Sequence, residues 1–270
     1  RARGGLATGA FALCVVLFLF AMTFGVLAKD ADQSSSWSAG GLWGGLAYLA
    51  AVFTYPAAGW LLAARRPDNP IGWLLLVIGA SWGFSATATY ADYTVKLHHD
   101  LAGGPVLAVL ANGCWLPAVG ITGTFLLLLF PDGHLLGRRW RYVAWTSAVA
   151  MVVGVTGLIL NPGPLGDAGY PGVQNPLGVD ALGSVLGVSW VAIFVVVVMM
   201  VASAASLVVR YRRARGPERQ QVKWLAAAAA GVARSASRQV SIAACSAPRR
   251  KARSRASSST EATAASGPSV

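Results

Sequence analysis

The sequence predicts an all-α protein, a polytopic transmembrane helix bundle with about six spanning helices. Apolar residues come in long uninterrupted blocks, and only 12% of the 270 residues are charged, about half the share that soluble domains carry. Basic residues fall in every second interval between these blocks, as they do in the cytoplasmic loops of membrane proteins. These three observations place the chain in the membrane class.

Six blocks are long enough to cross a bilayer, because a spanning helix needs about 20 predominantly apolar residues. The first block follows Arg1 and Arg3 and is longer than the apolar core of a secretory signal peptide, so we expect a retained helix. The blocks lie near residues 6–27, 42–63, 70–91, 106–130, 142–160 and 185–209.

The basic residues orient this bundle. Thirteen Lys or Arg residues lie before the first block or after the second, fourth and sixth blocks, whereas the other intervals hold two, Lys29 and Lys96. The positive-inside rule therefore puts the N-terminus, the Arg-rich intervals and the C-terminal tail in the cytoplasm of a plasma (cell inner) membrane protein.

The composition changes abruptly near residue 233. A seventh apolar block begins at Trp224 and stops at Val232, and residues 233–270 are rich in Ser, Ala and Arg. We expect a helical bundle over residues 1–232 and a disordered basic tail over 233–270, since the tail has few large apolar residues. One hypothesis is that the tail is out of frame and replaces the rest of a seventh helix. The alternative is a genuine tail that contacts anionic lipid.

Three Arg-rich intervals carry the motifs that we select as candidate functional residues. The first, residues 65–73, has Pro67, which cannot continue the preceding helix, and Asp68 or Asn69 can cap the next one. The second, residues 130–141, has a Pro-Asp-Gly turn signal and then an Arg and Trp cluster suited to lipid headgroups. With the basic segment after the sixth block, the selected residues are Arg65, Arg66, Asn69, Pro70, Trp73, Pro131, Asp132, Gly133, Arg138, Arg139, Trp140, Arg212, Arg213, Arg215, Glu218 and Arg219.

Several function classes lack their usual residues. No Asp, Glu, Lys or Arg lies near the middle of a block, where proton pumps and ion-coupled transporters usually need such residues. There is no Gly-rich phosphate loop, zinc-protease motif or nucleophile–base pair, so we expect neither an enzyme nor a bound cofactor. His98 and His99 are weak candidates for a metal site, because adjacent residues on a helix point to different faces. Residues 1–232 contribute half of the net charge of +12, in short segments beside the apolar blocks, and the tail 233–270 contributes the other half. Basic segments beside apolar blocks are typical of membrane proteins, so the charge is explained without nucleic acid. The three cysteines are expected to be free thiols.

Several of these segments also give the chain a likeness to a known family. Five stretches carry this likeness: residues 65–75, 129–133, 138–141, 175–178 and 210–225. With these stretches in the same order and at similar separations, the sequence over roughly residues 6–230 resembles the N-terminal multi-helix membrane sensor region of actinobacterial two-component sensor histidine kinases. His134 departs from that family, which often has Arg at this position.

The resemblance implies a sensor or signal-transduction module that is truncated before its catalytic domain. In that family the membrane region precedes cytoplasmic domains that dimerise, phosphorylate a histidine and then a response regulator. The kinase residues have no counterparts in this sequence, so a response regulator is a partner only where a kinase domain is present. The lipid bilayer is a partner expected from the apolar blocks themselves, and a second copy of the chain is a further expected partner. The alternatives are a small multi-pass transporter or permease-like protein, and a structural membrane scaffold.

Overall fold

The computed structural model describes residues 2–28, 41–99, 101–130, 133–166, 168–182 and 187–213. Within these residues the chain is almost entirely helical, and six helices are long and apolar enough to cross a membrane, so the predicted fold class is confirmed. The seventh apolar block and the basic tail lie outside the described residues. The spans are Arg3–Leu27, Gly45–Arg65, Pro70–Lys96, Gly104–Leu129, Trp140–Leu160 and Val188–Arg210.

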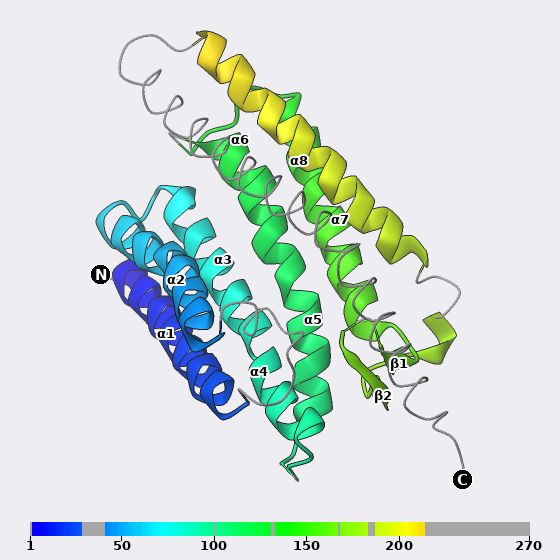
Figure 1. The fold of residues 1–270 in the computed structure, drawn as a ribbon. Coiled ribbons are helices and arrows are strands. Elements are labelled where there is room, and N and C mark those ends of the chain that lie inside the picture. Colours follow the sequence, from blue (N-terminus) through cyan, green and yellow to red (C-terminus); the bar gives the residue numbers. More distant parts are fainter. Residues whose placement is uncertain are drawn as a thin grey trace, which may run out of the picture. The chain divides into compact units, whose positions relative to one another are not determined.

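Figure 1 shows the elements in chain order. Their bounds are α1 (Ala2–Leu27), α2 (Gly41–Arg65), α3 (Pro70–Ala86), α4 (Ala88–Ala91), η2 (Asp92–Lys96), α5 (Gly104–Ile121), η3 (Thr122–Leu126), α6 (Leu127–Leu129), α7 (Trp140–Leu160), β1 (Pro164–Leu165), β2 (Tyr170–Gln174), η4 (Asp180–Leu182) and α8 (Gly187–Arg213). Short helical segments extend two of the spans: α4 and η2 continue α3, and η3 and α6 continue α5.

The first three spans pack against one another, and α3 also contacts α5. Pro56 inside α2 lies on Gly79 of α3, where a Cβ atom would approach Pro56 Cδ to 2.6 Å. The glycine therefore allows a close helix contact within the chain, a common device between membrane helices. Cys14 of α1 is buried in the same group of helices as a free thiol, and Cys114 of α5 is also free.

The last three spans form a second packed group. Leu116 of α5, Met151 of α7 and Val196 of α8 are buried in one apolar cluster. Gly157 of α7 lies so close to Ser189 of α8 that a Cβ atom on the glycine would overlap the serine side chain. Because lipid supplies no hydrophobic drive between helices, such close packing stabilises the contact between α7 and α8.

The third span is longer than its apolar block. The block ends near residue 91, but the π-helical segment η2 continues the span to Lys96. Lys96 Nζ lies 2.9 Å from Asp92 Oδ1, and both side chains are largely buried. Pairing one turn apart allows two charged residues to stay within the helix. Single-turn π-helical segments are rare and frequently lie at functional sites.

The interval between α7 and α8 contains a short antiparallel hairpin that the sequence analysis does not predict. Leu165 in β1 pairs with Tyr170 in β2, and strands this short leave no detectable period in the sequence. Asn175 holds the hairpin to the end of α7, because its Nδ2 donates hydrogen bonds to Ile159 O at 2.9 Å and Asn161 O at 2.7 Å. These bonds occupy carbonyl groups that a helix C-terminus leaves without partners.

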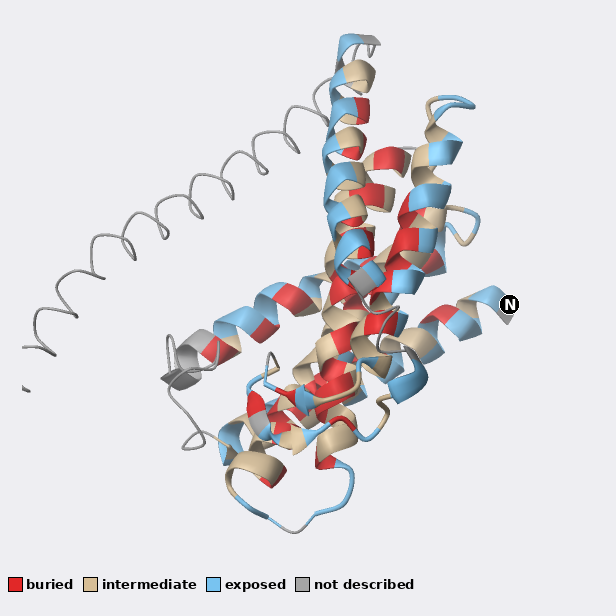
Figure 2. Cartoon of the chain, turned by 90° about the vertical axis from the view of Figure 1, so that its right-hand side faces the viewer, coloured by how far each residue is buried: buried red, intermediate tan, exposed pale blue. Residues whose placement is uncertain are grey.

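The outward faces of the spans are apolar. Trp190, Phe194 and Val201 of α8 are 65%, 66% and 69% exposed. Figure 2 shows buried residues concentrated where the helices face one another and exposed residues on the outer faces. Large exposed apolar surfaces are rare on soluble proteins, whereas acyl chains cover them in a bilayer. The distribution therefore agrees with membrane-spanning helices.

Candidate functional site

Most of the residues selected from the sequence lie at one end of the bundle, which we call the basic end. It comprises the start of α1, the turn 66–69 with the start of α3, the segment 133–139 with the start of α7, and the last turn of α8. Pro131, Asp132, Arg215, Glu218 and Arg219 lie outside the described residues. The selected residues that the structure describes are Arg65, Arg66, Asn69, Pro70, Trp73, Gly133, Arg138, Arg139, Trp140, Arg212 and Arg213.

Asn69 closes the turn between α2 and α3. Its Oδ1 accepts a hydrogen bond from the Ile71 N–H at 3.0 Å, and Pro70 occupies the first helical position. Asn69 rather than Asp68 is therefore the cap of α3. Asp68 instead accepts a hydrogen bond from the Arg3 guanidinium at 2.5 Å, which joins the start of α1 to this turn.

Trp73 reinforces the same turn from inside α3. Its Nε1 donates a hydrogen bond to Pro67 O at 3.1 Å. Arg65 and Arg66 at the end of α2 are exposed. Neutral hydrogen bonds therefore stabilise the turn from within, the charged bond from Arg3 joins it to α1, and the side chains of Arg65 and Arg66 take no part in these bonds.

The second motif packs directly on the first. Gly133 has a φ of +79°, a conformation that residues with a Cβ atom rarely adopt. A Cβ atom on Gly133 would lie 2.9 Å from Pro70 Cδ and 3.0 Å from Asn69 Oδ1. Both the backbone conformation and the available space therefore require glycine. Two motifs that are far apart in the sequence meet at this point.

Arg210 joins the end of α8 to the same region. Its Nη2 donates hydrogen bonds to Leu128 O, at 2.9 Å, and to His134 O. Leu128 lies in the last turn of the fourth span, where carbonyl groups lack partners within the helix and attract cations. In the sequence Arg210 is one of several basic residues after the sixth block, so the sequence analysis does not select it.

The opposite end, which we call the hairpin end, holds a second polar cluster. The Tyr170 hydroxyl donates a hydrogen bond to Asp92 Oδ1 at 2.9 Å, and Lys96 Nζ lies 5.2 Å from the centre of the Tyr170 ring. Tyr170 is only 5% exposed. Burial raises the pKa of Tyr170, and the Asp92 carboxylate raises it further, so the hydroxyl keeps its proton. This cluster joins the hairpin to the third span.

The sequence analysis misses this cluster because its members lie in different intervals. Asp92 and Lys96 are assigned there to the interval after the third block, and Tyr170 to the one after the fifth. The spacing of Asp92 and Lys96 is the only local signal, since residues four apart are neighbours on a helix. No local pattern indicates that Tyr170 meets them.

The two histidines selected as weak metal ligands lie at the hairpin end. His98 has a φ of +57°, and the His99 ring stacks on Tyr93 with ring centroids 4.2 Å apart. Among the residues that the structure describes, no group of three or more His, Cys, Asp or Glu is placed to hold a metal ion. Asp100, next to His99 in the sequence, lies outside those residues, so the metal site stays a prediction.

No protein-family model matches the chain, and no curated protein or solved structure matches it either. The resemblance to sensor histidine kinases therefore stays a prediction. The functional interpretation rests on the polar contacts at the two ends of the bundle and on the spans that connect them.

Proposed function

We propose that this protein is a membrane sensor or signal-transduction module in which α8 links the hairpin end to the basic end. One observation carries the proposal: the chain is attached to other spans both before and at the end of α8. Tyr170, ahead of α8, donates to Asp92 of the third span, and Arg210 donates to Leu128 O of the fourth span. The segment from Tyr170 to Arg210, which includes most of α8, is thus attached to other spans at both of its ends, and such a segment can transmit a displacement from one end to the other.

The basic end faces the cytoplasm of a plasma-membrane protein in this proposal. Exposed arginines gather there, among them Arg66 and Arg139, whereas the described charged pair of the hairpin end, Asp92 with Lys96, is neutral overall. The positive-inside rule favours this orientation. A cysteine introduced at position 66 should then react with a membrane-impermeant thiol reagent only after the cells are permeabilised.

A stimulus at the hairpin end would act on the contact between Tyr170 and Asp92. The Tyr170 hydroxyl also donates to Ala88 O at 3.3 Å, so loss of the bond to Asp92 weakens the attachment of the hairpin to the third span. The hairpin precedes α8 in the chain, so α8 can shift against α7, and Arg210 then leaves Leu128 O of the fourth span and His134 O of the segment that follows it. The residues after Arg213 would carry this displacement to an output, which by resemblance is a histidine kinase domain and its response regulator.

A transporter is the main alternative, and the positions of the charged residues speak against it. Ion-coupled transporters usually place charged side chains near the middle of the bilayer. In the described spans Asp, Lys and Arg lie close to the helix ends instead: Arg3, Arg65, Asp92, Lys96, Arg141 and Arg210. A structural scaffold, the third class, would need no connection between the two ends.

A distance measurement tests whether the two ends are coupled. Spin labels at positions 66 and 212, both exposed, report the separation of the turn and the end of α8 in a reconstituted variant without native cysteines. Tyr170→Phe should shift or broaden this distance distribution. The control Tyr142→Phe alters a tyrosine of α7 that is 73% exposed, and should leave the distribution unchanged.

Two results would count against the proposal. In the first, Tyr170→Phe speeds hydrogen exchange in residues 170–174, which shows that the hairpin is released, yet the distance distribution stays as in the wild type. In the second, proteoliposomes containing the protein accumulate a solute against a control without protein, which would favour the transporter.

A further inference from the structure

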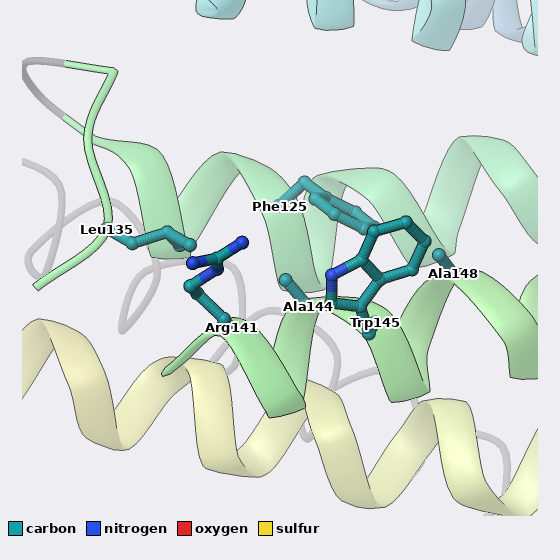
Figure 3. A pocket seen from close by; sticks show the side chains of 6 residues that line it. All are labelled: Phe125, Leu135, Arg141, Ala144, Trp145 and Ala148. Atoms are coloured by element: carbon teal, nitrogen blue, oxygen red, sulfur yellow. The ribbon is translucent and has the colours of Figure 1, made fainter. Parts of the chain in front are cut away.

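We propose that the protein binds an anionic phospholipid in a cavity at the basic end, with the lipid phosphate on Arg141 and one acyl chain beside Trp145. The cavity has a volume of about 190 Å³ and is lined by Phe125, Leu135, Arg141, Ala144, Trp145 and Ala148. Figure 3 shows the Arg141 guanidinium next to Leu135 at one side, and the rings of Phe125 and Trp145 at the other. A cationic group beside an apolar slot matches the chemistry of a phospholipid.

Two spans form the apolar part of the cavity. Phe125 comes from η3, and Ala144, Trp145 and Ala148 come from one face of α7, since residues three and four apart lie together on a helix. The two alanines leave space that larger side chains would fill. Trp145 is 67% exposed, so the cavity is an open depression, and part of an acyl chain can lie along it beside the indole ring.

The charge at this site is positive and lies where a helix favours an anion. Arg138 and Arg139 are exposed just before α7, and Arg141 lies in its first turn, which has no acidic residue. A helix N-terminus attracts anions and disfavours cations, so these arginines are unfavourably placed until an anion binds. A phosphate would offset that cost and accept charge-assisted hydrogen bonds from the Arg141 guanidinium.

Arg141 and Trp145 lie at a depth in the membrane that suits a lipid headgroup and the start of its acyl chain. Arg141 is the second residue of the fifth span, Trp140–Leu160, and Trp145 lies about one turn further along it. A guanidinium at a span end lies at the level of the headgroups, with the indole at the start of the acyl region. The bound lipid therefore comes from the leaflet at the basic end, and its selection by charge does not depend on the signalling role proposed above.

Native mass spectrometry of the full chain in detergent tests the site. Phosphatidylglycerol and phosphatidylcholine with the same acyl chains are added, and the bound fraction is measured against lipid concentration. We expect the wild type to prefer phosphatidylglycerol by about tenfold, a difference of about 1.4 kcal/mol. Arg141→Gln should abolish the preference. The matched control Arg66→Gln removes an exposed arginine outside the cavity and should keep it.

The apolar part needs its own variant. Ala148→Leu narrows the cavity without changing its charge and should weaken the binding of both lipids. If Arg66→Gln and Arg141→Gln lose the preference for phosphatidylglycerol equally, the lipid is attracted unspecifically to basic residues, and the proposal is overturned. If folded Ala148→Leu binds both lipids as fully as the wild type does, the proposal is overturned as well, because the acyl chain of the lipid would then lie outside this cavity.

Competition on the wild type avoids the risk that Ala148→Leu fails to fold. Diacylglycerol with the same acyl chains should displace phosphatidylglycerol, because it occupies the apolar part of the cavity. Inorganic phosphate should displace little of the lipid. Displacement by phosphate but not by diacylglycerol would mean that the site binds an anion only, and the phospholipid proposal would be wrong.

Discussion

Gly133 lies directly against Pro70, so close that a Cβ atom on the glycine would approach Pro70 Cδ to 2.9 Å. This contact joins the turn between the second and third spans to the segment between the fourth and fifth. Arg210 adds the end of α8 to the same region, because it donates a hydrogen bond to the carbonyl oxygen of His134, the residue after Gly133. The basic end is therefore one connected set of segments, in which a change in one turn affects the others.

Replacing Gly133 with alanine should destabilise the protein by about 1–3 kcal/mol. The new Cβ atom would strain a backbone with a φ of +79° and overlap Pro70. Thermal unfolding in detergent, followed by circular dichroism, measures the effect. Gly137→Ala is the matched control, since a Cβ atom there meets nothing within 4 Å. Equal melting temperatures for the two variants would contradict the contact with Pro70.

Asn69→Ala should cost about 1 kcal/mol, because the Ile71 N–H loses its hydrogen-bond acceptor at the start of α3. Asn69→Asp should restore most of the stability, since a carboxylate oxygen can also accept this bond. Asp68→Ala should have little effect, because its ion pair with Arg3 is exposed and exposed pairs contribute little. Chemical unfolding of the three variants compares them, and a larger loss for Asp68→Ala would show that Asn69 is not the cap.

Tyr170→Phe should destabilise the protein by about 1–2 kcal/mol at neutral pH, because the buried Asp92 carboxylate loses a hydrogen-bond donor. The matched control Tyr142→Phe removes an exposed hydroxyl and should leave the stability unchanged. Unfolding curves recorded at the same detergent concentration provide the comparison. A wild-type curve for Tyr170→Phe would show that this contact contributes nothing to stability.

The contribution of Tyr170 to the free energy of unfolding should decrease at high pH. Burial and the Asp92 carboxylate raise the pKa of Tyr170 in the folded protein, whereas an unfolded tyrosine ionises near pH 10. The folded state therefore holds the proton more tightly, and the contribution is complete below about pH 10 and declines as the pH rises further. The stability difference between wild type and Tyr170→Phe should follow this course.

Ultraviolet absorbance provides an independent check on the same group. Tyrosinate absorbs where neutral tyrosine does not, so wild type minus Tyr170→Phe isolates the signal of Tyr170. In the folded protein this difference should stay near zero through the pH range in which exposed tyrosines ionise, around pH 10. Full ionisation of Tyr170 in that range would contradict its burial against Asp92.

Arg210→Gln should loosen the segment after the fourth span. The variant weakens the hydrogen bonds from residue 210 to Leu128 O and His134 O. Between these two residues in the chain, the Gly133 N–H donates a hydrogen bond to Leu129 O at 2.7 Å. Hydrogen exchange at this amide should become roughly tenfold faster. Arg212→Gln, an exposed arginine of the same turn, is the control. Equal exchange in both variants would mean that Arg210 does not hold the segment.

The spans could be predicted closely because the length of an apolar block is a local property of the sequence. The end of the third span was the exception, since its block stops at Ala91 and the charged residues Asp92 and Lys96 indicate a loop. Their ion pair keeps them in the helix. The sequence predicts that the N-cap residue of α3 is either Asp68 or Asn69. The choice between the two depends on the tertiary structure, because Arg3 of another helix binds Asp68.

Six apolar spans, their order, and the concentration of arginine in every second interval follow from local composition, because bilayer thickness and loop charge act on each segment separately. The contacts between Tyr170 and Asp92, Gly133 and Pro70, and Arg210 and Leu128 follow from packing instead. Each contact joins segments distant along the chain, and a hydrogen bond forms only where the packed helices bring donor and acceptor to within about 3 Å. The candidate functional contacts therefore depend on the packing of the bundle, whereas the motifs around them can be predicted from the sequence.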